Sequence, residues 1–287
     1  MNESPLFEVC PLGCESSLAT TSLQLPEGKL KRCPSCGQLL SACTASRFEA
    51  SMQEFDVPEG TLPSERDAKR LHDRVGSNLH QAATLLGKPT SELKLLDVGC
   101  SSGSLLHVAS DLGYRVTGVE PATQAAATAQ NAGFEIFNGL LHEANFPDNS
   151  FDIITLYEVI EHLTDPLSLV REAHRILKPG GLFLIGTGNV DSWTVTALGP
   201  KWEYFSIDSH GGHISFFTPA SIRLMAEKTD FLVEGIQAKR VCLAERNSEP
   251  AILYRSKKLF AELMALPARW FNKGHDMFVI LRKPDNA

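Results

Sequence analysis

Short apolar runs alternate with amphipathic segments through the middle of the chain. The apolar runs predict strands, and segments with apolar residues three and four positions apart predict helices between them. Because continuous apolar strands need cover on both faces, the alternation indicates a doubly wound, mostly parallel sheet of the α/β class. The predicted strands are residues 93–98, 115–120, 134–137, 151–156 and 182–186, and the predicted helices are residues 104–112, 123–131 and 166–177.

Further elements are predicted on both sides of this alternation. Residues 64–86 place apolar side chains at helical spacing, and a Gly-Lys-Pro stretch ends that helix, which we expect to cover one wall of a pocket. Thr218 caps a helix that begins at Pro219 and runs to residue 228. Late strands are predicted at 231–239 and 276–282, with an amphipathic helix at 256–266 between them.

Four of the seven cysteines form two pairs near the N-terminus: Cys10 and Cys14, then Cys33 and Cys36. Paired thiolates at this spacing are typical of tetrahedral Zn²⁺ sites, and the segment resembles a zinc ribbon with two short strands between the pairs. Four unmetallated thiols or a redox-active C-x2-C pair are the alternatives. Cys43 lies outside the pattern and is predicted to be a spare thiol. The predicted domains are a zinc ribbon at 1–45, a helical linker and pocket cover at 46–92, and the sheet domain at 93–287 with a substrate-side insertion at about 188–217.

Composition limits the classes of partner. The 287 residues are 43% hydrophobic and 21% charged, which is typical of a globular chain that buries a core without disulfides. The net charge of −7 makes the surface a poor general match for nucleic acid. The apolar runs are too short to span a bilayer, and the first residues lack the features of a secretory signal, so we expect a cytoplasmic protein.

A glycine-rich turn follows the first predicted strand of the sheet. Asp97 lies just before the turn, and Gly99 and Gly103 stand in it with three residues between them. Backbone N–H groups in such a turn approach a ligand closely, although the spacing differs from the G-x-G-x-x-G of dinucleotide sites. The Asp97 carboxylate would repel a pyrophosphate and attract an ammonium group, and Glu120 at the end of the next strand can accept both hydroxyls of a ribose. The pattern favours a cationic ligand that carries a ribose and an amino acid.

These residues resemble the motifs of class I S-adenosylmethionine-dependent methyltransferases. The turn from Asp97 to Gly103 matches the first motif and Glu120 the second. Residues 151–154 match the fourth strand of that family, and residues 177–181 match the turn before its fifth strand. The resemblance covers residues 93 to about 190, and it implies a Rossmann-like methyltransferase fold with S-adenosylmethionine as cofactor.

The same resemblance implies which residues hold the cofactor. It places the methionine part near the glycine-rich turn and the ribose on Glu120. Leu140 and Leu141 stand where the family often has an acid for the adenine amino group, so we expect an apolar sandwich of the adenine there. The predicted cofactor-binding residues are Asp97, Gly99, Cys100, Ser101, Gly103, Glu120, Leu140, Leu141 and Tyr157.

Acidic residues and a histidine follow the fourth strand of this resemblance. The stretch 157–162 contains Glu158, Glu161 and His162. It resembles the E-x-x-E-H of ubiquinone-type O-methyltransferases and of small-RNA 2′-O-methyltransferases, in which these positions can hold a divalent metal. Carboxylates and imidazole are suitable ligands for such an ion. The alternative is that the same side chains only line the pocket.

Two histidines flank a Gly-Gly pair ahead of the helix that Thr218 caps. His213 begins a segment that resembles the H-x-S-[FY]-F-[ST] of methyltransferases acting on sugars, and in sugar C-methyltransferases the matching histidine is the proposed general base. Neutral imidazole is well suited to accept a proton near pH 7. We therefore predict His213 as the first catalytic residue and His162 as the second, with His210 as a substrate contact or a loop residue. A histidine with a purely structural role beside the helix is the alternative for His213.

Together these features predict an enzyme that methylates a small polar metabolite or a sugar-type acceptor at an oxygen or carbon atom. A nucleotide-sugar is one acceptor of this type. A zinc-ribbon RNA methyltransferase is the first alternative, since residues 29–32 form a small basic cluster in the ribbon. A non-catalytic module that binds the cofactor is the second alternative. Nothing in the sequence indicates an oligomeric state.

Overall fold

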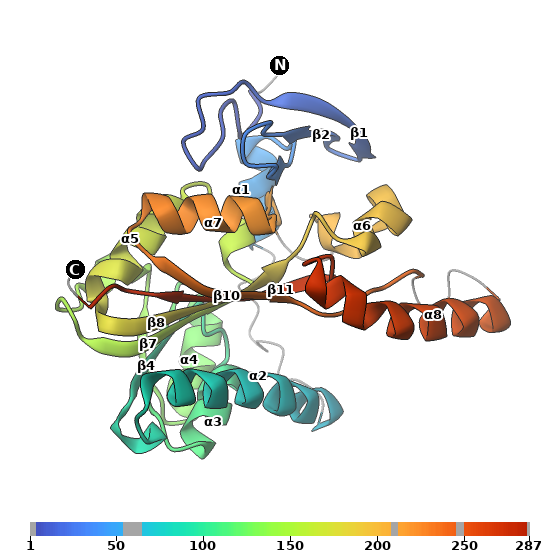
Figure 1. Cartoon of the computed structure of the whole chain (residues 1–287). Coiled ribbons are helices and arrows are strands. Elements are labelled where there is room, and N and C mark those ends of the chain that lie inside the picture. The colour runs from blue at the N-terminus through green and yellow to red at the C-terminus, as the bar shows by residue number, and fades with distance from the viewer. Residues whose placement is uncertain (1–3, 54–64, 208–211, 245–249, 286–287) are drawn as a thin grey trace.

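A twisted seven-stranded sheet forms the centre of the computed structural model, in which residues 4–53, 65–207, 212–244 and 250–285 are described (Figure 1). The strand order is β10-β11-β8-β7-β4-β5-β6. The neighbours from β8 to β6 pair in parallel, and β11 is antiparallel to both of its neighbours. The predicted fold class is confirmed. The strands are β4 Lys94–Val98, β5 Arg115–Glu120, β6 Glu135–Asn138, β7 Phe151–Tyr157, β8 Leu177–Gly188, β10 Leu232–Ala238 and β11 Asp276–Arg282.

Helices cover both faces of the sheet (Figure 1). On one face lie α2 (Glu65–Leu86), α3 (Ser104–Asp111) and α4 (Thr123–Asn131). On the other face lie α5 (Pro166–Ile176) and α7 (Pro219–Lys228), and Thr218 caps α7 as the sequence predicts. Burial of apolar side chains between helix and strand is the main term that stabilises this arrangement. One core cluster joins the sheet to α5 and α7, and a second joins it to α2 and α3.

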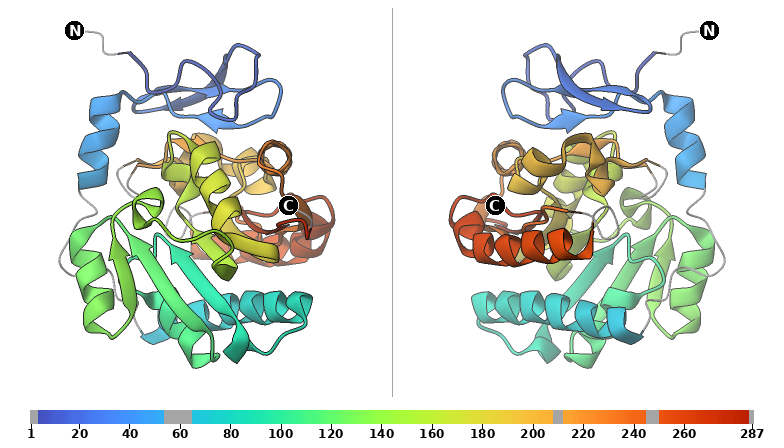
Figure 2. Two further views of the ribbon diagram at one scale, coloured as in Figure 1. Left: turned by 90° about the vertical axis from the view of Figure 1, so that its left-hand side faces the viewer. Right: turned by 90° about the vertical axis from the view of Figure 1, so that its right-hand side faces the viewer.

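A small antiparallel sheet at the N-terminus contains the two cysteine turns. Its strands β1 (Ala19–Leu25), β2 (Gly28–Arg32) and β3 (Leu39–Leu40) come from the first 40 residues, and we call this segment the cysteine ribbon. A fourth strand, β9 (Ser215–Phe216), comes from the segment between β8 and β10 of the central sheet and pairs with β3. The ribbon lies over the face that α5 and α7 cover (Figure 2). The ribbon is therefore joined to the rest of the molecule by backbone pairing. The domain boundaries given above stay a prediction.

Three helices differ from the sequence prediction. Helices α1 (Ala45–Gln53) and α6 (Trp193–Leu198) were not predicted, because their apolar residues are too few to show a clear period. Helix α8 (Ala251–Trp270) is longer than the predicted 256–266, so that prediction was wrong about its ends. It continues past Pro267 because the buried Ala261 and Ala268 anchor it in a core cluster with Val241. The described residues also form the 3₁₀ turns η1 Thr90–Glu92, η2 Leu141–Ala144, η3 Ile160–His162, η4 Gly199–Lys201 and η5 Glu203–Phe205.

Within the described part of the chain, no helix has the combination of length and apolar composition needed to cross a bilayer.

Candidate functional site

The turn after β4 depends on glycine at two positions. Gly99 has a φ of +73°, and a Cβ atom there would lie 2.4 Å from Val159 Cγ2. Gly103 has a φ of +88° and forms the N-cap of α3. Only glycine adopts these angles without strain, and only glycine lets the segment around Val159 pack this closely. Glycine at these two positions therefore lets the turn pack directly against the segment that follows β7 and against α4.

Asp97 lies beneath this turn and is 3% exposed. Its Oδ1 accepts a hydrogen bond of 2.6 Å from Thr155 Oγ1 on the neighbouring strand β7. Burial raises the pKa of Asp97 to about 7, and the Thr155 hydrogen bond only partly offsets that effect. A buried carboxylate without a cationic partner is costly, so this position favours a positively charged group nearby.

Glu120 organises the backbone at the end of β5. Its two carboxylate oxygens accept hydrogen bonds from the N–H groups of Ser101 and Ala122, both at 2.8 Å. Ser101 has a φ of +47°, and its bond to Glu120 stabilises that unusual conformation. Each carboxylate oxygen can accept a second hydrogen bond, so the side chain can also bind a diol.

The other residues predicted to contact the cofactor surround this edge of the sheet. Cys100 is buried, and burial raises the pKa of its thiol, so it is a neutral packing group. Leu140 is half-exposed, whereas Leu141 is buried at the start of η2. The Tyr157 hydroxyl accepts a 2.9 Å hydrogen bond from Asn78 Nδ2, which connects the end of β7 to helix α2.

A buried polar cluster lies next to the glycine-rich turn, beyond the end of β7. Its centre is the Glu161 carboxylate, which has no exposed surface. The carboxylate accepts hydrogen bonds from Thr187 Oγ1 at 3.0 Å and from the hydroxyl of Tyr204. Burial, followed by the charge of Glu161, raises the pKa of Tyr204 well above its usual range, so the hydroxyl stays protonated and donates.

His213 belongs to the same cluster and is 3% exposed. Its Nδ1 lies 2.9 Å from the carbonyl oxygen of Tyr204, and because a carbonyl only accepts, Nδ1 carries a proton. Its Nε2 lies 3.6 Å from Glu161 Oε1. The His162 ring packs edge-on against the His213 ring with 4.7 Å between the ring centres, and it is less buried. The prediction for His210 falls outside the described residues.

The donor atoms of Glu161, His162 and His213 all lie within 4.8 Å of one another, so together they form a candidate metal site. This group differs from the predicted set, because His213 stands in it in place of Glu158. Burial and the charge of Glu161 raise the pKa of Glu158 well above its usual range. Glu158 also has a left-handed φ of +54°, which is uncommon for a glutamate. The sequence spacing alone could not show that a residue 51 positions later than His162 completes the cluster.

The cysteine ribbon brings its four predicted ligands together. The four Sγ atoms lie within 4.8 Å of one another, and those of Cys10 and Cys36 are 3.7 Å apart. A tetrahedron with Zn–S bonds of 2.3 Å has edges of about 3.8 Å, so the arrangement fits a zinc ion. Each pair sits on a tight turn. Gly13 N–H donates to the carbonyl of Cys10 in the first turn, and Gly37 N–H donates to the carbonyl of Cys33 in the second. Both glycines have positive φ angles.

Backbone pairing connects the ribbon to the strand that follows His213. Leu39 and Leu40 of β3 pair with Phe216 and Ser215 of β9. Immediately before β9, Ile214 N–H donates to the carbonyl of Glu161 at 3.0 Å. The His213 segment is thus held between the ribbon and the buried cluster.

Sequence reasoning missed two members of this cluster. The sequence patterns assign no polar role to Tyr204 and do not single out Thr187. Both hydroxyls reach Glu161, and the Tyr204 hydroxyl also accepts a 2.9 Å hydrogen bond from Gly188 N–H. The only sequence signal is their position at and beyond the carboxyl end of β8, where ligands bind in open sheets.

Comparison with known proteins gives matches of three kinds. Residues 68–235 match a family described as a methyltransferase domain. The chain is 30% identical over 187 residues to the ubiquinone biosynthesis O-methyltransferase of Vibrio parahaemolyticus, an alignment that covers 60% of this chain and 77% of that protein.

Solved structures of methyltransferases share the fold. One is a SAM-dependent methyltransferase from Archaeoglobus fulgidus, with a TM-score of 0.53 and 17% identity over 75% of this chain and 94% of that one. Another is a putative sarcosine dimethylglycine methyltransferase from Galdieria sulphuraria, with a TM-score of 0.53 and 18% identity over 84% of this chain and 98% of that one.

Proposed function

Since this chain belongs to the class I S-adenosylmethionine-dependent methyltransferases, we propose that it methylates a hydroxyl group, or an acidic carbon, of a small polar or sugar-type acceptor. S-adenosylmethionine supplies an activated methyl group on a sulfonium centre, so the protein mainly has to orient the acceptor, exclude water and take up one proton. The observation that carries the proposal is the buried Glu161–His213 pair next to the glycine-rich turn. The contact of Val159 with Gly99 joins the two parts of the site.

His213 is the proposed proton acceptor. The hydrogen bond from Nδ1 to the Tyr204 carbonyl fixes the tautomer in which Nε2 is the basic nitrogen. When Nε2 takes the proton of the acceptor group, the Glu161 carboxylate 3.6 Å away stabilises the imidazolium that forms. Tyr204 and Thr187 keep the carboxylate in place through their hydroxyl groups. His162, which is more exposed, is proposed to contact the acceptor and is the second candidate for the base.

The charges of the ribbon support a small acceptor over RNA. Of the cations in its basic cluster, Lys31 donates to the carbonyl of Phe7 at 3.0 Å and Arg32 donates to the carbonyl of Gly37 at 3.4 Å. These contacts give both side chains a role inside the ribbon. The chain as a whole is acidic, which disfavours a phosphate backbone. Methylation of RNA would be expected to need a basic surface that reaches from the ribbon to His213.

We further propose that the ribbon binds one structural Zn²⁺ through Cys10, Cys14, Cys33 and Cys36. The spacing of the Sγ atoms and the two glycine turns support this ligand set. A closed site of four thiolates leaves no position for a substrate, so the zinc has a structural role. Through β3 and β9 it would hold His213 in place.

A divalent metal at Glu161, His162 and His213 is the second candidate for how the site works. The compact donor group supports it, because one carboxylate and two imidazoles suit a transition metal. The two candidates differ in one measurement. If a metal takes part, a chelator abolishes turnover and added divalent ions restore it, whereas a histidine base alone is indifferent to both.

Replacement of Glu120 by alanine is expected to weaken S-adenosylmethionine binding about 10- to 150-fold. Loss of a hydrogen bond to a charged group costs about 1.5–3 kcal/mol, and this carboxylate also holds the Ser101 turn. Calorimetric titration measures the change. The matched control is Glu135→Ala on the neighbouring strand β6, which should bind normally, and equal losses in both variants would contradict the assignment.

We expect the free energy of unfolding of the ligand-free protein to depend on pH because Asp97 titrates. Its pKa is about 7 in the folded chain and 3.8 as the ordinary value, so folding favours the protonated form. This contribution to stability is fully present below about pH 4 and is lost as the pH rises to about 7. Thermal denaturation of wild type and Asp97→Asn over this range isolates the effect, because the variant lacks the group that titrates. Parallel pH profiles for the two proteins would contradict the raised pKa of the buried Asp97 carboxyl group.

A further inference from the structure

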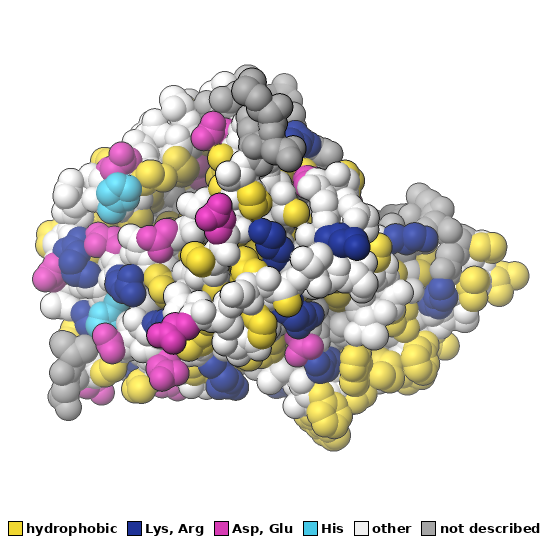
Figure 3. All heavy atoms as spheres, turned by 90° about the horizontal axis from the view of Figure 1, so that it is seen from above, with side chains coloured by type: hydrophobic (Ala, Val, Ile, Leu, Met, Phe, Trp, Pro, Cys, Tyr) yellow, Lys and Arg dark blue, Asp and Glu magenta, His cyan; other side chains and the backbone are white. Residues whose placement is uncertain are grey.

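The outer face of helix α8 carries a continuous stripe of exposed apolar side chains. Successive members stand seven, four, three and four positions apart, so they follow one side of the helix. Exposure reaches 85% at Ile252 and 80% at Trp270. Figure 3 shows hydrophobic side chains gathered at the end of the molecule where α8 projects. We call these residues the α8 stripe: Ile252, Leu259, Leu263, Leu266 and Trp270.

The opposite side of α8 packs on the protein. The buried residues there are the small Ala261 and Ala268, which contact Val241 and its neighbours. A row of large apolar side chains that are exposed together marks an interaction surface, since their contact with solvent is unfavourable. Leu253, Phe260 and Phe271 are also exposed and widen the stripe along one edge.

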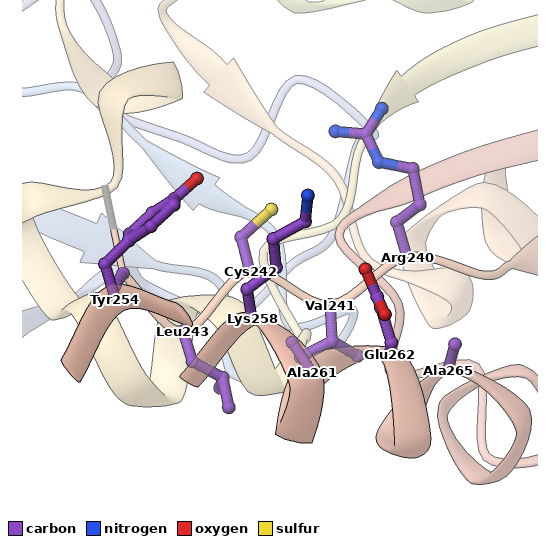
Figure 4. A pocket seen from close by; sticks show the side chains of 10 residues that line it. Arg240, Val241, Cys242, Leu243, Tyr254, Lys258, Ala261, Glu262 and Ala265 are labelled. Atoms are coloured by element: carbon purple, nitrogen blue, oxygen red, sulfur yellow. The ribbon is translucent and has the colours of Figure 1, made fainter. Parts of the chain in front are cut away.

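Cations follow the other edge of the stripe. Helix α8 contains four cations and one acid, Glu262, which gives it a net charge of +3 in a chain whose total is −7. Arg255, Lys258 and Arg269 are three and eleven positions apart, so they lie on one side of the helix beside the stripe. Glu262 stands in the same row, four positions after Lys258, and the row keeps a net charge of +2. A hollow of about 260 Å³ lies between α8 and the loop at 240–244. Figure 4 shows the ends of Lys258 and Arg240 on the same side of the helix.

We propose that α8 docks on a lipid bilayer that contains anionic headgroups. A helix with leucine, phenylalanine and tryptophan on one face and cations beside it lies in the membrane interface with its apolar face inserted. A second copy of the chain is disfavoured as the occupant, because pairing two α8 helices brings two charges of +3 together. An anionic surface matches both the apolar stripe and the basic row. The enzyme thereby binds to a membrane surface through α8.

Vesicle sedimentation with the full chain tests this proposal. We expect the wild type to sediment with vesicles of phosphatidylcholine and phosphatidylglycerol, and to bind vesicles of phosphatidylcholine alone at least tenfold more weakly. The double variant Leu259→Gln, Leu263→Gln should lose at least tenfold in affinity, because both side chains insert. The matched control is Leu232→Gln, which changes an exposed leucine outside the stripe and should bind as the wild type does.

The basic row is tested by the double variant Arg255→Gln, Lys258→Gln. Each cation near an anionic surface contributes roughly a factor of five in affinity, so this variant should lose about 25-fold on the anionic vesicles and little on the neutral ones. Its apolar contacts are unchanged, so it carries the test even if the leucine variant does not fold. Absence of vesicle binding by the wild type would overturn the proposal. A dimer in analytical ultracentrifugation that the leucine variant dissociates, with no vesicle binding, would overturn it in favour of a second copy.

Discussion

Replacement of His213 by asparagine is expected to lower turnover about 100- to 10,000-fold while the dissociation constant of S-adenosylmethionine changes less than about twofold. A positioned base contributes this factor to a rate, and Nε2 of His213 is the atom proposed to take the proton. Asparagine is a suitable substitute because its amide N–H can still donate to the Tyr204 carbonyl, so the backbone contact of the ring is retained. Steady-state kinetics at saturating substrate, together with calorimetric titration of the cofactor, measure the two effects separately.

Two further variants serve as controls for the effect of His213→Asn on turnover. His142→Asn changes an exposed histidine in η2 and should keep normal turnover. Glu120→Ala should show the opposite pattern, with weakened cofactor binding as its main effect. Wild-type turnover in His213→Asn would show that the histidine is structural, and His162→Asn would then be the next variant to measure.

The second large effect is expected when Cys33 and Cys36 are both replaced by serine. The variant should lose its zinc and the fold of the ribbon, since four thiolates bind zinc with an apparent free energy of about 10–16 kcal/mol in small zinc domains. Turnover should fall about 100-fold, because a small displacement of a catalytic group is enough for such a loss. Cofactor binding should remain, since Glu120 at the end of β5 holds the glycine-rich turn through Ser101 N–H.

Turnover should depend on the ribbon because a series of contacts connects it to the segment that contains His213. Thr218 Oγ1 donates to the carbonyl of Cys36 at 3.0 Å, and β3 pairs with β9 two residues after His213. Elemental analysis, circular dichroism and calorimetry follow zinc, fold and cofactor binding in turn. Cys43→Ser is the matched control, because this buried cysteine lies outside the cluster and should leave the zinc in place. A wild-type protein that is purified without chelator and contains no zinc would contradict the zinc site.

The central sheet could be predicted because its signals are local. The strand at 115–120 and the helix at 123–131 have the predicted bounds, since each is an apolar or periodic run between glycine and proline positions. Helix α7 also begins where Thr218 and Pro219 predict, because capping depends only on neighbouring residues. Periodicity also indicated that α8 is a helix, but it does not show whether the apolar face points into the protein or away from it.

The parts that could not be predicted depend on contacts between distant residues. Strand β9 has two residues, too few for a period, and it exists because β3 is placed beside it by the ribbon. The role of Tyr204 likewise depends on Glu161, which is 43 residues away and fully buried. Side chains that no sequence pattern marks as part of a polar site thus join the cluster only once the chain is folded. The roles assigned to the candidate site residues stay predictions until the variants are measured.

Calorimetric titration of the purified wild-type protein with S-adenosylmethionine tests the central claim most directly. We expect one site per chain with a dissociation constant of about 1–100 μM, typical of an enzyme and its substrate, and the same site should bind the demethylated product. Asp97 and Glu120 at the ends of β4 and β5 carry this expectation. Absence of binding heat for both compounds, in protein shown to be folded, would contradict it.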